Sequence, residues 1–340
     1  MIVLGVESSC DETACAIVKD GKEVLSNVVL SQIDIHTKFG GVVPEIASRE
    51  HVYNVSMCFE EAFKKANLKP EDIDLVAVTE GPGLIGSLLV GVNAAKTFAL
   101  MYNKPLIGIN HLAGHIYANA IEHDMKFPSI ALLVSGGNTE LIYMKEHFSF
   151  ELIGETLDDA VGEAYDKVAR VVGIGYPGGP IVDKLAHLGT DTYHLPRVTL
   201  GNDNYNFSFS GLKSAVINLN HNYEQRGEKI DVNNLCASFQ EAVTDVLCEK
   251  ALKACREYNV KQLIVAGGVS ANKGLKEKLN RENTNSNLEI CIPSIKYCTD
   301  NAVMIAAAGY YRYQKNNTLD DLSLNADASL ELVSVLENNK

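Results

Sequence analysis

Short unbroken blocks of apolar residues open the chain, and blocks of this length bounded by polar turns are typical of buried β-strands. Two such blocks lie at residues 2–6 and 14–18, and the polar segment 7–13 between them predicts a turn. Further short strands are expected at residues 75–79 and 106–109. The chain is therefore predicted to begin as β structure.

Longer segments carry the helical period. Ser48 can cap a helix whose apolar positions follow a 3.6-residue repeat, namely Val52, Val55, Phe59, Ala62 and Phe63. Residues 87–101 form a second predicted helix. Because this helix is apolar nearly all round, it is expected to be buried between layers.

The strand, turn, strand pattern is repeated from Ser129 onward, at residues 130–135 and 139–144, which indicates an internal duplication. Beyond this hairpin the chain alternates predicted helices and strands. The helices are expected at residues 158–172, 180–188, 212–219, 234–258 and 301–313, and the strands at 262–266 and 288–292. Strands interleaved with helices predict an α/β protein.

Length and composition narrow the class of protein. A chain of 340 residues with 46% apolar residues is long enough to bury two cores. The 8 cysteines include no CxxC pair, which favours a reducing compartment, and we expect a cytoplasmic protein. No basic segment precedes the first apolar block, so that block predicts a strand rather than a signal peptide. Uncharged apolar stretches are shorter than a membrane span requires, and no membrane association is expected.

The formal net charge of −13 argues against unaided, non-specific nucleic-acid binding, because such binding depends on Lys and Arg displacing counterions from phosphates. A nucleic-acid contact would need a local basic patch or a surface shared with a partner. Lys273, Lys276, Lys278 and Arg281 form one candidate patch, and the alternative is a solvated helix face.

Two turns carry candidate chemistry at corresponding places in the repeat. The segment ESSCDET, residues 7–13, presents three carboxylates with turn N–H groups, which suits a phosphate or a metal ion; the alternative is a solvated hairpin tip. In VSGGNTEL, Ser135, Gly136 and Gly137 lack bulky side chains, so the backbone can donate hydrogen bonds to a phosphate at close range. Two such turns on duplicated units favour a nucleotide cleft.

Two further glycine pairs precede predicted helices. Gly267 and Gly268 follow a strand in AGGVSAN, and ligands of open α/β sheets collect at such strand ends. In YPGGP, Gly178 and Gly179 precede a helix, and the carboxylate of Asp183 one turn further on could hold ribose hydroxyls. Each pair alone is also compatible with an ordinary helix-entry turn.

The segment NHLAGH places His111 and His115 at i and i+4, so both imidazoles lie on one helix face and can reach a single ion. An isolated pair of this kind can equally be a detail of the surface or core. Asp300, at the start of the last predicted helix, could add a carboxylate ligand and leave positions open for substrate. Zincin peptidases need a glutamate after the first histidine, and Leu112 stands there, so peptidase chemistry is disfavoured.

Other motifs add little by themselves. The helix predicted from residue 158 carries a polar stripe of Asp159, Glu163, Asp166 and Arg170, which indicates only a solvated face. The sequence contains no GxxxxGK[ST] loop and no GxSxG elbow, so P-loop and α/β-hydrolase mechanisms lack support.

Motifs along nearly the whole chain resemble one family, the bacterial tRNA N6-adenosine threonylcarbamoyltransferases, once taken for O-sialoglycoprotein endopeptidases. The segments ESSCDET, EGPGLIGSLLVG, NHLAGH, LLVSGGNTEL, GEAYDKVAR, YPGGP, FSFSGLK, AGGVSAN and TDNA occur in the family's order. The resemblance implies the actin-like ATPase fold shared by sugar kinases and heat-shock chaperones, with two lobes on duplicated ribonuclease H-like cores. The first lobe would take residues 1–127 plus 301–325, and the second residues 128–300.

The resemblance also implies a reaction. The enzyme would move the threonylcarbamoyl group of threonylcarbamoyl-AMP to N6 of the adenosine 3′ of the anticodon in tRNAs reading ANN codons, and release AMP. By resemblance, one iron or zinc ion is bound by His111, His115 and Asp300 and acts as a Lewis acid. Asp11 and Glu12 match acidic residues near the reacting end, where help with proton transfer from N6 is a hypothesis.

A further set of residues matches the family's substrate contacts. The segment VSGGN would cradle phosphate or acyl groups, and four other positions would hold the adenylate, which supplies an adenine nucleotide as part of the substrate. The set is Val134, Ser135, Gly136, Gly137, Asn138, Asp166, Gly179, Asp183 and Asn272. Asn138 departs from the histidine that many relatives carry; since Asn cannot shuttle a proton, a catalytic role for that side chain is in doubt.

The implied partners are tRNA, a catalytically inactive paralogue that dimerises with this subunit, and a small P-loop ATPase; they could supply the tRNA surface that an acidic chain lacks. Two other functions remain open. A metabolite kinase of the same superfamily would need Mg²⁺ and a carboxylate base rather than a histidine pair. A non-catalytic ATPase scaffold would not need an intact metal triad with an open position. A glycoprotein peptidase is the weakest alternative.

Overall fold

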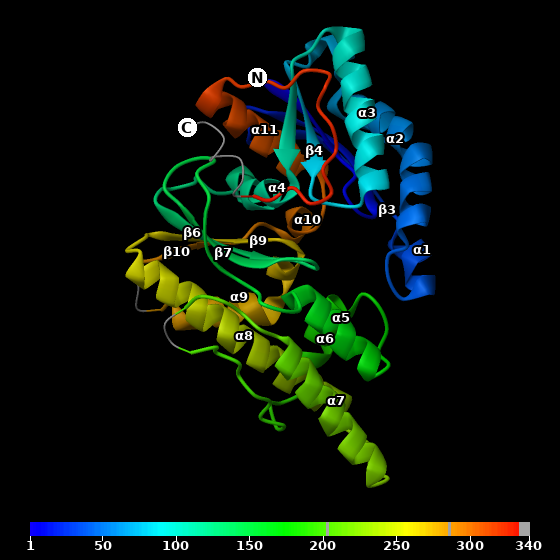
Figure 1. The fold of residues 1–340 in the computed structure, drawn as a ribbon. Helices are drawn as coiled ribbons and strands as arrows, with labels where there is room; N and C mark the ends of the chain where they lie inside the picture. The colour runs from blue at the N-terminus through cyan, green and yellow to red at the C-terminus, as the bar shows by residue number, and fades with distance from the viewer. Residues whose placement is uncertain (202–203, 285–286, 333–340) are drawn as a thin grey trace. The chain divides into compact units, whose positions relative to one another are not determined.

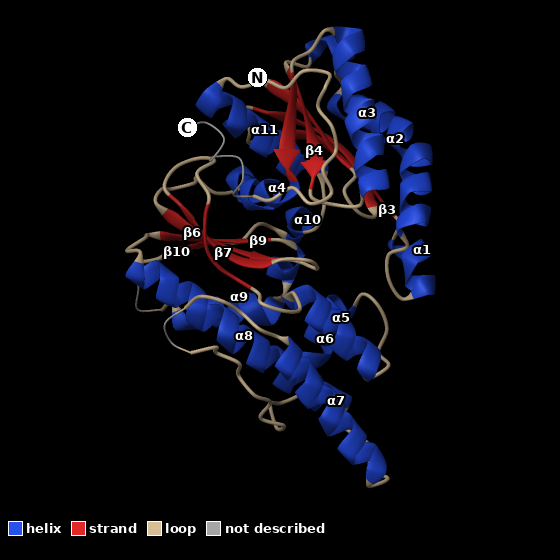
Figure 2. Cartoon of the chain, viewed as in Figure 1, coloured by secondary structure: helices blue, strands red, loops and turns tan. Residues whose placement is uncertain are grey.

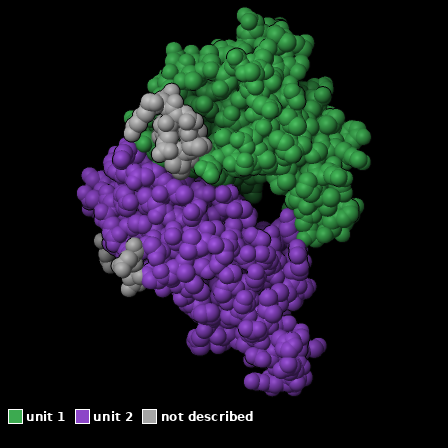
Figure 3. Space-filling view, viewed as in Figure 1, with its two compact units in different colours: residues 1–125, 146–150, 293–340 green, residues 126–145, 151–292 purple. Residues whose placement is uncertain are grey.

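The computed structural model describes residues 1–201, 204–284 and 287–332, and the chain forms two compact units (Figures 1 and 3). Unit 1 contains Met1–Met125, Glu146–Phe150 and the chain from Pro293 onward. Unit 2 contains Lys126–Lys145 and Glu151–Ile292. Each unit is built on one mixed five-stranded sheet with helices beside it (Figure 2), so the predicted α/β class is confirmed.

The sheet of unit 1 has the order β3-β2-β1-β4-β5. Its strands are β1 (Ile2–Glu7), β2 (Glu12–Lys19), β3 (Glu23–Ser31), β4 (Leu75–Gly81) and β5 (Leu106–Asn110). The first three strands form an antiparallel meander, and β4 and β5 run parallel to β1. The helices of unit 1 are α1 (Ile33–His36), α2 (Pro44–Ala66), α3 (Ile85–Tyr102), α4 (His111–Tyr117), α10 (Ile295–Cys298) and α11 (Ala302–Asn316).

The sheet of unit 2 repeats this arrangement, with the order β10-β9-β6-β7-β8. Its strands are β6 (Ser129–Val134), β7 (Thr139–Met144), β8 (Glu151–Glu155), β9 (Gln262–Ala266) and β10 (Glu289–Cys291). Here β6 pairs antiparallel with β7 and parallel with β9, just as β1 pairs with β2 and β4. The helices of unit 2 are α5 (Val161–Val171), α6 (Gly178–Ala186), α7 (Ser210–Gln225), α8 (Val232–Glu257) and α9 (Lys273–Glu282). The predicted internal duplication is therefore confirmed in strand order and direction.

The two faces of the unit 1 sheet carry different helices, and the alternation of side chains along β1 decides which residues meet which helix. A Cβ on Gly5 would lie 2.2 Å from the carbonyl oxygen of Ala302, so this face of β1 lies directly against α11. Leu4 and Val6 point to the opposite face, where they share a buried cluster with residues of α2 and α3. Glu7 follows Gly5 on the α11 face.

Several element limits differ from those predicted. Helix α2 begins at Pro44, a turn before Ser48, because proline suits the first helical position. Helix α5 begins at Val161, so Asp159 precedes it and the predicted polar stripe is shortened. Strands β3 and β8 were not predicted, since their mixed polar and apolar residues lack the unbroken apolar blocks of the inner strands.

Helix α3 is long and apolar enough to cross a membrane by length and composition alone, although Lys96 interrupts it, and the sequence prediction did not single it out in this way. In the structure its buried residues, including Val92, Ala95 and Phe98, lie against α2 and the sheet. Figure 1 shows α2 and α3 side by side.

Candidate functional site

The turn between β1 and β2 is held in place by hydrogen bonds to the start of α3. The hydroxyl of Ser8 donates to the carbonyl of Ser87 at 2.8 Å and accepts from the N–H of Gly91 at 3.1 Å. The N–H of Leu84 donates to the carbonyl of Ser9 at 2.7 Å. The segments ESSCDET and EGPGLIGSLLVG thus form one packed unit, in which the second positions the first.

A buried histidine on α2 holds the other side of this turn. His51 Nε2 lies 2.9 Å from the carbonyl oxygen of Cys10, and its Nδ1 lies 2.7 Å from Thr13 Oγ1. A carbonyl only accepts, so Nε2 carries the proton and Nδ1 accepts from the threonine hydroxyl. Burial lowers the pKa of His51, in keeping with a neutral ring. His51 was not among the predicted site residues, because its contacts are with a turn far away in the sequence.

His111 and His115 lie on α4, as predicted. The side chain of Asn110 caps this helix by accepting from the N–H of Leu112 at 2.8 Å, so the helix begins at His111 and the i,i+4 spacing brings both imidazoles to one face. Their ring centroids are 4.7 Å apart.

Asp300, just before the cap of α11, meets both histidines. Its Oδ1 lies 3.5 Å from His111 Nε2 and 3.1 Å from His115 Nε2. The three residues offer ligand atoms that all lie within 4.8 Å of one another. Two imidazoles and one carboxylate suit iron(II) or zinc and leave coordination positions open, so the residues fit the implied metal.

The charges of this cluster stabilise one another. Burial would raise the pKa of Asp300, but the neighbouring His111 and His115 hold it at about 2. Burial would lower the pKa of His111, but Asp300 and Glu7 raise it to about 9. In the metal-free protein His111 is therefore protonated at neutral pH, and a metal ion must replace that proton.

The carboxylates of the β1–β2 turn interact with this cluster through their charges. Burial raises the pKa of Glu12 to about 9, and the negative charges of Asp300 and Asp11 contribute. The carboxyl of Glu12 also accepts from the hydroxyl of Ser31 at 3.0 Å. The structure thus brings the predicted residues Asp11 and Glu12 into one charged environment with the predicted metal ligand Asp300.

The corresponding turn of unit 2, between β6 and β7, is closed by its own backbone. The N–H of Ser135 donates to the carbonyl of Asn138 at 2.9 Å, and the N–H of Asn138 donates to Ser135 Oγ at 3.0 Å. A Cβ on Gly136 or Gly137 would meet no heavy atom of the described residues within 4 Å. The amide of Asn138 donates to Glu140 at 2.8 Å. The two glycines therefore leave open space above the turn.

Two close approaches fix the surroundings of that turn. Gly162, at the start of α5, donates its N–H to the carbonyl of Ser135 at 3.1 Å. Gly267, at the end of β9, has φ +89°, and a Cβ there would lie 2.4 Å from the carbonyl oxygen of Val134. The predicted glycine loop after β9 thus lies directly beside the predicted residue Val134.

The four residues predicted to hold an adenylate lie in unit 2, on α5 (Asp166), on α6 (Gly179 and Asp183) and at the N-cap of α9 (Asn272). Asp166 accepts from the N–H of Gly178 at 2.7 Å, beside Gly179, whose Cβ position is open among the described residues. Asp183 accepts from the N–H of Lys273 at 3.1 Å, and Asn272 caps α9. Burial raises the pKa of Asp166. Asp166 and Asp183 are thus structural braces of α6 and α9 as well as candidate contacts.

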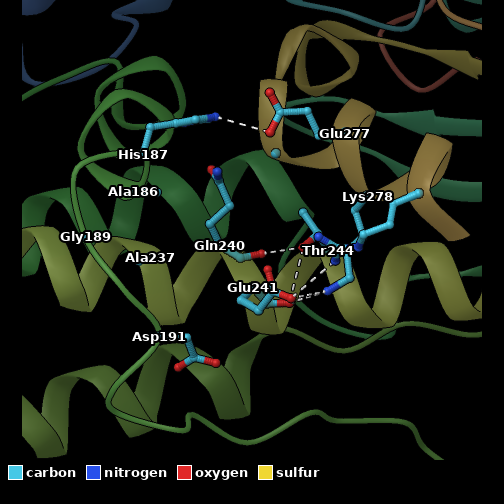
Figure 4. A pocket seen from close by; sticks show the side chains of 12 residues that line it. Ala186, His187, Gly189, Asp191, Ala237, Gln240, Glu241, Thr244, Glu277 and Lys278 are labelled. Carbon is cyan, nitrogen blue, oxygen red and sulfur yellow. Dashed lines mark hydrogen bonds and ion pairs between the residues drawn. The ribbon is translucent and has the colours of Figure 1, made fainter.

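A pocket of about 210 Å³ lies between α6, α8 and α9 (Figure 4). Gln240, which lines it, accepts from Asn272 Nδ2 at 2.8 Å, so the pocket adjoins a predicted adenylate residue. Lys278 is only 3% exposed and pairs with Glu241 and Asp245. The predicted basic patch at residues 273–281 is therefore wrong in including Lys278, whose charge is neutralised within the protein.

The segments GEAYDKVAR and FSFSGLK are joined by the residues before α5. Asp158 accepts from the N–H groups of Phe209 and Ser210 at the start of α7, and Asp159 pairs with Lys167 and Lys213 at 2.7 and 2.9 Å. These bonds lower the pKa of both aspartates against the effect of burial. The expectation of a solvated face at Asp159 is thus corrected, since tertiary ion pairs hold it.

The matching family model and highly similar known proteins carry the same name. Residues 23–307 match the family model described as tRNA N6-adenosine threonylcarbamoyltransferase. Proteins of that name from Staphylococcus carnosus and Staphylococcus aureus (strain JH9) are each 58% identical; the alignments cover 97% and 98% of this chain and 96% and 97% of those proteins.

Solved structures with little sequence identity share the fold. Full-length HypF is similar with a TM-score of 0.63 at 14% identity, over 93% of this chain and 47% of that one. Component A of (R)-2-hydroxyglutaryl-CoA dehydratase from Acidaminococcus fermentans is similar with a TM-score of 0.53 at 16% identity, over 92% of this chain and 99% of that one. Both have the actin-like ATPase fold, which confirms the predicted architecture.

Proposed function

Because this chain belongs to the tRNA N6-adenosine threonylcarbamoyltransferase family, and is therefore a transferase that modifies tRNA, we propose that it takes its acyl group from threonylcarbamoyl-AMP. In the proposed reaction N6 of the adenosine attacks the carbonyl carbon of the mixed anhydride. The bond from that carbon to the phosphate oxygen breaks, AMP leaves with the electron pair, and N6 loses a proton.

The observation that carries the site assignment is the convergence of His111, His115 and Asp300. These residues would hold one metal ion, with iron(II) proposed and zinc as the alternative, since two imidazoles and a carboxylate are the donor set of both. When bound, the ion would supply Lewis-acid stabilisation of the negative charge that develops on the acyl oxygen.

The side chains of the β1–β2 turn have a separate role in this proposal. Asp11 and Glu12 would accept the proton from N6, because they are carboxylates beside Asp300 on a turn that His51 and α3 hold in place. A carboxylate accepts a proton only when it is ionised, so the bound ion would also have to lower the pKa of Glu12.

Unit 2 would bind the nucleotide end of the substrate. The open backbone at Gly136 and Gly137 supports a phosphate or acyl cradle, with Val134, Ser135 and Asn138 shaping the turn. Asp166, Gly179, Asp183 and Asn272 would hold the adenosine, and the polar pocket beside Gln240 offers amide and carboxylate groups for a purine.

We further propose that protein partners complete the tRNA site, in the cytoplasm. All 8 cysteines are free thiols, as in a reducing compartment.

Helix α2 exposes Val52, Tyr53 and Met57 by 55–72%, and α3 exposes Leu100 and Met101 by 67–69%, which supports docking of the inactive paralogue there. Replacing Tyr53 and Met57 by Glu should abolish co-purification with that subunit; unchanged co-purification would place the interface elsewhere. The small P-loop ATPase and tRNA are the remaining proposed partners.

The deciding experiment supplies purified protein, its partners, threonylcarbamoyl-AMP and unmodified tRNA, and measures threonylcarbamoyladenosine after digestion of the tRNA. His111→Ala is compared with His221→Ala, which replaces an exposed histidine on α7. Product from the parent and from His221→Ala, but not from His111→Ala, supports the proposal. Equal product from all three would remove the metal assignment, and phosphorylation of a metabolite by the parent would favour a kinase.

A further inference from the structure

Glu7 is a completely buried carboxylate at the end of β1, and it lies outside the ligand set and the substrate contacts described above. Its position is set by the alternation of the strand, which places it on the α11 face, the same face as Gly5. Thr79, on the neighbouring strand β4, is equally buried and contacts it. A buried charge is costly unless hydrogen bonds and an opposite charge compensate it, so its partners indicate its purpose.

Three donors converge on this carboxylate. Oε1 accepts from the backbone N–H of Ser9 at 2.5 Å, and Oε2 accepts from the hydroxyl of Thr79 at 2.5 Å. Oε2 also lies 3.1 Å from Nδ1 of His111. The Ser9 donor belongs to the backbone and cannot be reversed, so Oε1 is held as an acceptor and Oε2 is directed at the histidine.

This arrangement decides which nitrogen of His111 carries the proton. A carboxylate oxygen that already accepts can only accept again, so Nδ1 of His111 donates to it. Ser9 Oγ, at 3.1 Å, can accept from the same N–H. With Nδ1 protonated, the lone pair of a neutral ring is on Nε2, the nitrogen that faces Asp300 at 3.5 Å.

We propose that Glu7 is a positioning residue that holds His111 in the Nδ1–H tautomer, so that Nε2 is available to bind the metal ion. This inference rests on the proposed metal centre. A carboxylate behind a ligating histidine fixes both the tautomer and the ring orientation, and removing such a partner typically costs about 10- to 100-fold in metal affinity.

Glu7→Gln is a sharp test because the amide keeps the shape of the side chain. The Ser9 N–H needs an acceptor, so the amide oxygen takes the Oε1 place and the NH₂ group takes the Oε2 place. Thr79 can rotate its hydroxyl to accept from the NH₂ group, but His111 must then accept at Nδ1 and carry its proton on Nε2. That tautomer cannot bind a metal through Nε2.

The measurement is the affinity of the metal-free full-length chain for Zn²⁺, by competition with a chromogenic chelator, for the parent and for Glu7→Gln. Glu80→Gln is the matched control, because Glu80 is also a carboxylate of unit 1 but pairs with Arg312 instead of a histidine. We expect the affinity of Glu7→Gln to fall about 10- to 100-fold and that of Glu80→Gln to stay at the parental value.

A second measurement uses only the parent protein, so it does not depend on whether the variant folds. Long-range ¹H–¹⁵N correlation spectra of the histidine-labelled, Zn²⁺-loaded parent report which nitrogen of His111 bears a proton. We expect a proton on Nδ1 and the zinc-shifted resonance on Nε2.

The outcomes separate the two proposals. A parent that binds zinc through Nδ1 of His111, or a folded Glu7→Gln that binds zinc as tightly as the parent, overturns the role of Glu7 and leaves the metal centre standing. A parent that binds no zinc or iron at this cluster overturns the metal centre and the role of Glu7 with it.

Discussion

In unit 1 the turn between β1 and β2 is filled by side chains that bond to one another, whereas the turn between β6 and β7 in unit 2 has glycines with open space beside them. The two turns occupy the same place in the same strand topology. One presents carboxylates next to a pair of histidines, and the other presents its backbone.

This difference shows how one duplicated scaffold can supply two kinds of chemistry. Charged side chains near His111 and Asp300 suit a metal ion and proton transfer, and they require buried braces such as His51 to keep them in place. Backbone N–H groups at Gly136 and Gly137 suit a phosphate or acyl group, and they require only that no side chain stands in the way.

The largest effect is expected from removing the carboxylate of the histidine cluster. Asp300→Ala removes the carboxylate oxygen that faces both histidines and that would bind the metal ion beside them. We therefore expect transfer activity to fall by about 100-fold or more and bound metal to be lost. Product formation and elemental analysis measure this. Asp34→Ala, an exposed aspartate on α1, is the control. Full metal content in Asp300→Ala would show that Asp300 is not a ligand.

A smaller effect is expected from adding one methyl group to the open turn of unit 2. Gly137→Ala meets no protein atom of the described residues within 4 Å, so its thermal stability should stay close to that of the parent. The methyl group would occupy the space above the backbone, and we expect KM for threonylcarbamoyl-AMP to rise about 10-fold, or ~1.4 kcal/mol. Gly211→Ala on α7 serves as the matched control. An unchanged KM would contradict the backbone cradle.

The pH dependence of stability between pH 6 and pH 9 should arise from two groups of unit 1, His111 and Glu12. His111 has its pKa raised from 6.5 to about 9, so its contribution to stability is fully present below pH 6.5 and is lost as pH rises through 9. Glu12, raised from 4.5 to about 9, changes in the same direction. The metal-free protein should therefore melt a few degrees lower at pH 9 than at pH 6.

Thermal melts across this pH range, with chelator and with Zn²⁺, measure the effect. Zinc should flatten the curve, because the ion replaces the proton on His111. Without metal, His111→Ala should lose the part of the slope that His111 contributes and keep the part that Glu12 contributes. A parental slope in that variant would assign the pH dependence to other groups.

The smallest effect is expected at Asn138, the position that departs from the family pattern. Its side-chain amide is directed at Glu140, and its backbone N–H already bonds to Ser135 Oγ. If unit 2 acts through its backbone, Asn138→Ala should change kcat by less than about 3-fold, within ~0.7 kcal/mol. A fall as large as that of Asp300→Ala would mean that this side chain takes part in the chemistry.

Local patterns in the sequence predicted much of this molecule. Apolar blocks gave the inner strands, the repeat gave the duplication, and the spacing of His111 and His115 placed both on one helix face, because each of these signals acts between residues close together in the chain. Motifs that match the family indicated Asp300 as the third candidate ligand, although nothing in local spacing could place it beside α4.

The tertiary structure decided the rest. Glu7 and His111 are 104 positions apart, and Thr13 and His51 are 38 apart, so neither pair has a periodic signal. Lys278 was predicted to belong to a basic surface patch, but it is buried against Glu241 and Asp245. What the sequence alone determined is which segments form the inner strands, the longer helices and the open turns. Which side chains hold the histidines and which charges are neutralised depends on strand order and helix packing, because those bring together residues that lie far apart in the chain.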